Sequence, residues 1–108
     1  MYDYKATVVK IVDGDTIDVD IDLGFYMVTR QRLRINRIDT PERGQDGFHE
    51  ATDRVKELCP VGSQVVVSTS KAGKFGRWIA EVTTTYLGHE INLSDQMLLE
   101  GLAKEYGK

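Results

Sequence analysis

The stretch Arg32-Leu-Arg-Ile-Asn-Arg-Ile-Asp-Thr-Pro-Glu-Arg43 decides much of the predicted fold, because it begins as a strand and ends in a turn. Leu33 and Ile35 alternate with Arg34 and Asn36, which is the period of two expected for a half-buried strand. We therefore expect Arg34 to point away from the apolar core.

The strand cannot continue past Pro41, which lacks a backbone N–H donor and favours extended geometry at Thr40. Two carboxylates, Asp39 and Glu42, flank this proline in a short turn just beyond Arg34. Holding an arginine and two acids this close at the end of a strand indicates a functional site.

Composition sets the limits of the interpretation. The chain has 108 residues, a net charge of −3, 41% apolar and 29% charged residues, so we expect one globular domain over residues 1–108. This charge excludes a diffuse basic surface, so local positive charge must hold any anionic partner. The single cysteine, Cys59, excludes an internal disulfide and is expected in the core.

The sequence is expected to contain neither a targeting signal nor a membrane-spanning segment. No apolar run is long enough to span a membrane, and no signal peptide begins the chain, so no membrane partner is expected. The compartment stays open: the protein is cytoplasmic, or secreted if a leader was removed. A monomer is expected.

Periodicity and turn signals predict five strands, a short strand edge at Ile91 and two helices. The expected strands cover residues 4–12, 17–23, 26–38, 64–69 and 78–85, and the expected helices cover 48–58 and 92–101. Asp46 is the expected cap of the first helix, and Asn92 or Ser94 that of the second. The order β-β-β-α-β-β-α predicts an α+β fold: a five-stranded OB-fold barrel with helices.

Four segments carry candidate chemistry: Asp13-Gly-Asp-Thr16, Arg34, Asp39-Thr-Pro-Glu42 and Lys74-Phe-Gly-Arg77. With these motifs, in this order and near this spacing, the chain resembles the staphylococcal nuclease (thermonuclease) family. The run Leu-Leu-Glu-Gly-Leu-Ala-Lys at residues 98–104 also matches the family's second helix. Any single motif is weak, whereas the set is specific and covers nearly the whole chain.

The residues suit phosphodiester hydrolysis, which needs an activated water and compensation of charge on the phosphoryl oxygens. Asp15 and Asp39 are candidate ligands of a hard cation such as Ca²⁺. Glu42 is placed to position or deprotonate a water near that cation. Arg34 and Arg77 can each make bidentate contacts to a phosphate.

The resemblance implies further roles. It makes the Thr40 carbonyl a third Ca²⁺ ligand, and it places Arg34 and Arg77 on either side of the scissile phosphate. It implies that DNA or RNA is cut to products with 3′-phosphates. Mg²⁺ and Mn²⁺ suit the same ligands.

Three further residues are expected to contact the substrate. Lys74 belongs to the motif that ends at Arg77. Phe75 stands where the family often has a tyrosine beside the nucleotide phosphate, and Tyr106 takes the place of one of the tyrosines of the nucleotide pocket.

Structural interpretations compete with these roles. Taken singly, Asp15 can close a hairpin turn, Arg34 can be solvated and the stem of Arg77 can cover the barrel. A second acidic row could be a metal site, but its members lie about 7 Å apart along a strand, so we expect a solvated face. This row consists of Asp18, Asp20 and Asp22.

A catalytically silent OB-fold module that binds nucleic acid or a peptide remains the alternative function, and the acidic net charge keeps it open. Such a module would be expected to lose the acids and arginines. The presence of all of them favours the Ca²⁺-dependent nuclease.

Overall fold

A computed structural model describes residues 2–72 and 78–106. Its elements are β1 (Tyr2–Asp13), β2 (Thr16–Gly24), β3 (Met27–Ile35), β4 (Ile38–Asp39), α1 (Phe48–Leu58), β5 (Gln64–Ala72), β6 (Trp78–Tyr86), β7 (His89–Asn92), α2 (Leu93–Leu99) and β8 (Lys104–Glu105). Within these ranges no helix is long and apolar enough to cross a membrane.

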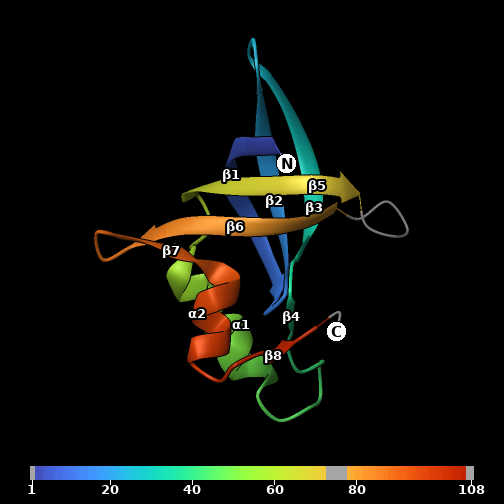
Figure 1. The fold of residues 1–108 in the computed structure, drawn as a ribbon, viewed down its shortest axis with the longest axis vertical. Helices are drawn as coiled ribbons and strands as arrows, with labels where there is room; N and C mark the ends of the chain where they lie inside the picture. Colours follow the sequence, from blue (N-terminus) through green and yellow to red (C-terminus); the bar gives the residue numbers. More distant parts are fainter. Residues whose placement is uncertain (1, 73–77, 107–108) are drawn as a thin grey trace.

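Strands β1, β2, β3, β5 and β6 form a closed barrel. The sheet runs in the order β3-β2-β1-β5-β6-β7, and β3 also pairs in parallel with β6, which closes the ring. The helices lie together at one end of the molecule, and the β2–β3 hairpin projects at the opposite end (Figure 1). The predicted OB-fold barrel is confirmed.

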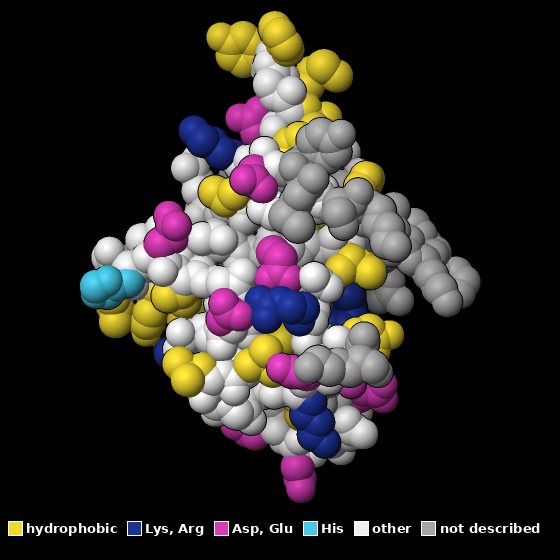
Figure 2. Space-filling model, in the orientation of Figure 1, with side chains coloured by type: hydrophobic (Ala, Val, Ile, Leu, Met, Phe, Trp, Pro, Cys, Tyr) yellow, Lys and Arg dark blue, Asp and Glu magenta, His cyan; other side chains and the backbone are white. Residues whose placement is uncertain are grey.

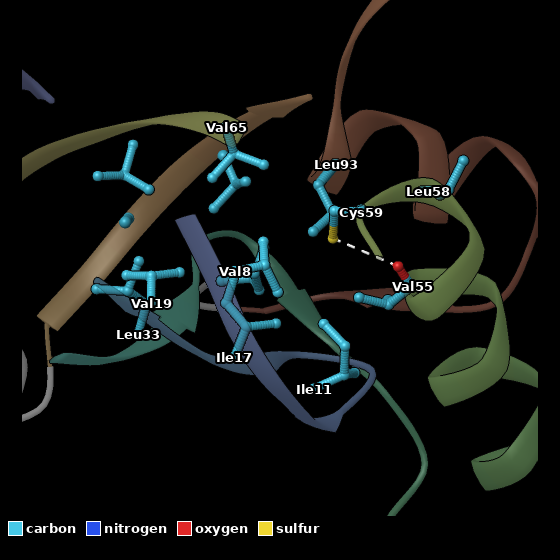
Figure 3. Close-up of a cluster of buried hydrophobic side chains, with 14 of the residues drawn as sticks. Val8, Ile11, Ile17, Val19, Leu33, Val55, Leu58, Cys59, Val65 and Leu93 are labelled. Carbon is cyan, nitrogen blue, oxygen red and sulfur yellow. Dashed lines mark hydrogen bonds between the residues drawn. The ribbon is translucent and has the colours of Figure 1, made fainter. Parts of the chain in front are cut away.

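The core fills the barrel and continues under α1. Inward-facing side chains such as Val8, Ile17 and Leu33 belong to the same buried cluster as Val55 of α1 (Figure 3). Cys59 is also buried, as predicted: its thiol donates to the Val55 carbonyl at 3.3 Å, and burial raises its pKa to about 12.

The third strand is shorter than the sequence indicates. Instead of continuing to residue 38 it ends at Ile35, because Arg37 takes a left-handed backbone conformation with φ of 69° that breaks the ladder. The Arg37 guanidinium is held by Glu81 at 2.9 Å and Asp95 at 2.8 Å. The chain then resumes as β4, which pairs with β8.

The caps of the two helices differ in how well the sequence predicts them. Asp46 does not cap α1: Gly47 precedes the helix with φ of 90°, a conformation that glycine adopts readily, and makes no side-chain bond. Asn92 caps α2 by accepting from the Asp95 N–H at 2.9 Å, as predicted. Ser94 instead donates to the carbonyl of Asn36 at 2.6 Å.

Candidate functional site

Asp15 lies in the turn between β1 and β2, where hydrogen bonds to its backbone and its carboxylate fix it. Its own N–H donates to Asp13 Oδ1 at 3.1 Å, and its carbonyl accepts from the Ile35 N–H at 2.8 Å. Its carboxylate accepts from Thr16 Oγ1 at 3.0 Å and from the Thr40 N–H at 3.1 Å. The last bond ties the first hairpin to the turn that follows β4.

Arg34 extends from β3 into the space between two carboxylates. Its Nη1 lies 3.2 Å from Asp15 Oδ2, and its Nη2 lies 3.6 Å from Asp39 Oδ1. Its guanidinium carbon is 5.1 Å from the centroid of the Tyr106 ring. The Asp15 side chain is only 11% exposed, whereas that of Asp39 is 58% exposed. The cluster therefore has a buried floor and an open rim.

The electrostatics of the turn keep Asp15 ionised. Burial alone raises the pKa of the Asp15 carboxyl, but bonds with Asp13 and the Thr40 N–H and the charge of Arg34 outweigh it, so the net pKa is lowered. Burial and proximity to Asp15 raise the pKa of Asp13. Of the two carboxyls, the one that faces Arg34 is thus the stronger acid.

Gly14 lets the turn approach the end of β4. A Cβ at this position would lie 2.9 Å from the Ala51 Cβ and 2.9 Å from the Thr40 side chain. The same Thr40 hydroxyl is buried and has no hydrogen-bond partner among the described residues. The close approach brings the Thr40 backbone to the Asp15 carboxylate.

The chain after α2 completes the cluster. Asp39 pairs with Lys104 in the β4–β8 ladder, and the Tyr106 N–H donates to the Arg37 carbonyl at 2.9 Å. These backbone bonds place the Tyr106 ring against Arg34. The structure thus places the Tyr106 ring beside Arg34, and its contact with substrate stays a prediction.

Glu42 lies in a tight turn that its backbone shares with Gln45. The Glu42 N–H donates to Gln45 Oε1 at 2.8 Å, and the Gln45 N–H donates to the Glu42 carbonyl at 2.9 Å. Within the described ranges the Glu42 carboxylate makes no hydrogen bond or ion pair and is exposed. The side chain is therefore accessible to water.

A groove of about 590 Å³ lies beside the cluster. Asp39, Thr40 and Pro41 form one part of its wall, and Lys104 belongs to the opposite segment. The open rim of the cluster at Asp39 thus borders this groove. Three predicted site residues, Lys74, Phe75 and Arg77, lie outside the described residues.

The donor chemistry fits a calcium ion. Asp15 and Asp39 carry carboxylates that face the same guanidinium from two sides, and hard oxygen donors of this kind suit Ca²⁺. No cluster of three or more His, Cys, Asp or Glu side chains suited to a metal occurs in the described ranges. Any ion here would therefore depend on two carboxylates, a backbone carbonyl and waters.

Two residues that position Asp15 were not predicted from the sequence: Asp13 and Thr16. Both lie in the motif Asp13-Gly-Asp-Thr16, and both orient Asp15 through hydrogen bonds. The signal was present: an Asp two residues before a turn N–H commonly accepts from it.

The fold and the cluster define a small OB-fold barrel with a polar site of two carboxylates around an arginine. A family model described as Staphylococcal nuclease homologue matches residues 32–108, so the chain belongs to that family.

Two relatives have names that bear on function. The chain is 34% identical over 116 residues to a protein of Shigella flexneri named micrococcal nuclease, covering 98% of this chain and 62% of the relative. It is 33% identical over 106 residues to an uncharacterized endonuclease of Escherichia coli O157:H7, covering 96% and 62% respectively. The chain thus spans about three fifths of each relative's length.

Proposed function

We propose that this protein is a Ca²⁺-dependent nuclease that hydrolyses DNA and RNA to products with 3′-phosphates. The observation that carries the proposal is the position of Arg34 between Asp15 and Asp39. Family membership and the names of the two relatives support it.

The chain's own residues divide the work between binding and proton transfer. Arg34 places Nη1 at the buried floor and Nη2 toward the open rim of the cluster, and a guanidinium can match two phosphoryl oxygens. Arg77 is proposed for the opposite side of the same phosphate. Glu42, exposed and without a protein partner in the described ranges, accepts the proton of the attacking water.

Asp15, Asp39 and the Thr40 carbonyl are the residues that would hold Ca²⁺. When bound, the ion supplies positive charge beside the phosphoryl oxygens, where negative charge builds up in the transition state. Lys74, Phe75 and Tyr106 are proposed to contact the nucleotide.

The test is degradation of single-stranded DNA and of RNA with Ca²⁺ and with a chelator, for the parent and for Glu42→Gln. We expect Ca²⁺-dependent cutting that falls by about 10²- to 10⁴-fold in the variant, as for the loss of a general base. Exposed Glu50 is the matched control, and Glu50→Gln should cut like the parent.

Product ends test the remaining part of the proposal. Products with 3′-phosphates become substrates for polymerase extension only after phosphatase treatment. Products that are extended directly would contradict the assigned polarity of cleavage. A parent that binds nucleic acid but fails to cut it with every divalent ion tested would be a catalytically silent binding barrel.

A further inference from the structure

The tip of the β2–β3 hairpin exposes large apolar side chains. The exposed members are Leu23, Phe25, Tyr26, Met27 and Val28. Figure 2 shows them as an apolar cap at the end of the molecule where this hairpin projects. From Leu23 to Thr29 the sequence contains no charged residue. We call residues 23–29 the hairpin tip.

The two residues at the turn contact almost nothing of their own chain. Phe25 is 94% exposed and Tyr26 is 105% exposed relative to the reference state. A projecting apolar group of this kind is not buried by a flat surface, which covers one side alone, whereas a medium that surrounds it buries every side. The interface of a lipid bilayer is such a medium, and it favours aromatic side chains with one polar end such as tyrosine.

The backbone of the turn is unfavourable for these residues. Phe25 and Tyr26 have φ of 55° and 63°, positive at both central positions, where two-residue hairpins prefer Asn and Gly. The β6–β7 hairpin has the same positive pattern at Leu87 and Gly88, but with glycine at the second position. The tip thus keeps two aromatic residues at a backbone cost, which points to a use for their side chains.

The two arginines nearest the tip are paired with acids of the neighbouring strand. Arg30 forms an ion pair with Asp20 at 2.8 Å, and Arg32 forms one with Asp18 at 2.8 Å. These bonds, with the arginine charges, lower the pKa of both carboxyls. The base of the hairpin therefore offers little net positive charge to a polyanion, and it disfavours nucleic acid as the partner of the tip.

The backbone of the hairpin also suits an apolar medium. Gly24 pairs with Met27 across the two-residue turn, and the Gly24 N–H donates to Asp22 Oδ1 at 2.8 Å. These contacts satisfy part of the backbone next to the turn within the hairpin, which limits the cost of removing it from water.

We propose that the hairpin tip inserts into the interface of a zwitterionic lipid bilayer and holds the protein at its surface. No membrane partner was expected from the sequence, because it contains no segment that can span a bilayer. Insertion at the interface, however, needs no spanning segment. This inference goes beyond the proposed function and does not rest on it.

The test uses phosphatidylcholine vesicles and two variants. Phe25→Asn/Tyr26→Gly installs the turn residues that the backbone prefers and removes both aromatic rings. We expect the fraction of protein that sediments with vesicles to fall at least roughly tenfold, while the melting temperature stays equal or rises. Leu87→Asn changes an exposed apolar turn residue at another place and should leave vesicle binding unchanged.

Depth of insertion gives an independent readout. An indole introduced by Phe25→Trp should be quenched by brominated lipid, whereas one introduced by Leu87→Trp should not. Binding should also be insensitive to salt and to added anionic lipid, because the tip carries no charge.

A parent that does not bind vesicles would overturn the inference. So would a Phe25→Asn/Tyr26→Gly variant that binds vesicles like the parent, whether or not its melting temperature is lower. An indole at position 25 that brominated lipid does not quench would overturn it as well. Loss of dimers, or loss of oligonucleotide binding, in that variant without any vesicle binding would assign the tip to a second copy or to nucleic acid.

Discussion

Arg34 and Asp15 form the central ion pair of the candidate site, with Nη1 of the arginine 3.2 Å from Oδ2 of the aspartate. The pair joins β3 to the β1–β2 turn. Because Asp15 is buried and Asp39 is exposed on the other side, the guanidinium lies between a fixed carboxylate and an accessible one.

Arg34→Lys tests whether the shape of the guanidinium matters beyond its charge. Lysine keeps the charge but cannot make a bidentate contact to phosphate. We expect kcat on single-stranded DNA to fall by about 10²- to 10³-fold, as for the loss of one transition-state donor. Ca²⁺ affinity, measured by calorimetry, should be retained. A change in KM alone would contradict a role in the transition state.

Asp39→Asn tests the proposed calcium ligands. Loss of one of two carboxylates should weaken Ca²⁺ binding by at least about tenfold, because affinity follows the charge of the ligand set. Asp46 lines the same groove outside the proposed ligand set, so Asp46→Asn is the control. Equal Ca²⁺ titrations for the two variants would place the ion elsewhere.

Gly14→Ala tests the close approach of the turn to α1. The new methyl would lie 2.9 Å from the Ala51 Cβ, so we expect a loss of about 1–3 kcal/mol in the free energy of unfolding. A double-mutant cycle with Ala51→Gly should recover part of this loss, since the two carbons compete for the same space. Strictly additive effects of the two substitutions would show that the two carbons do not compete for the same space.

Glu81 predicts a pH dependence of stability. Burial raises its pKa, but bonds from Arg37, Asn92 and Asn36 outweigh burial and hold the pKa below the ordinary value of 4.5. A carboxyl whose pKa is lowered by folding stabilises the fold at pH values above its pKa in the unfolded state. This contribution is lost as the pH falls through its pKa in the folded state.

Glu81→Gln should therefore cost about 1–3 kcal/mol at pH 7, in the range for hydrogen bonds to a charged group. The difference from the parent in urea unfolding should shrink as the pH is lowered below about 4.5. Exposed Glu90 serves as the control, and Glu90→Gln should show a smaller difference at every pH. A difference that grows in acid would contradict the assignment.

The sequence predicted the elements whose signal is local. The alternation that begins at Ile17 and the helical spacing of Val55 and Leu58 both depend on a single buried face, and both were confirmed, except that burial on the strand stops at Ile21 and Leu23 is exposed. The pairing of Ile38–Asp39 with Lys104–Glu105 was missed, because two-residue strands have no periodicity and exist only through their partner.

The site was predictable to a similar degree. Motif spacing identified Asp15, Arg34 and Asp39, which the structure brings together. It gave no indication that Arg37, with its left-handed backbone, would end the strand and turn the chain toward β8. That geometry depends on Glu81, which lies in a distant strand.

The β4–β8 ladder also sets an order of events during synthesis. The segment Lys104–Glu105 leaves the ribosome long after Arg34 and Asp39, yet it forms the strand partner of Asp39 and precedes the tyrosine that contacts Arg34. A nascent chain that has not reached this segment lacks both contacts. The arrangement of Asp39 and Arg34 is thus incomplete on the nascent chain until β8 pairs with β4.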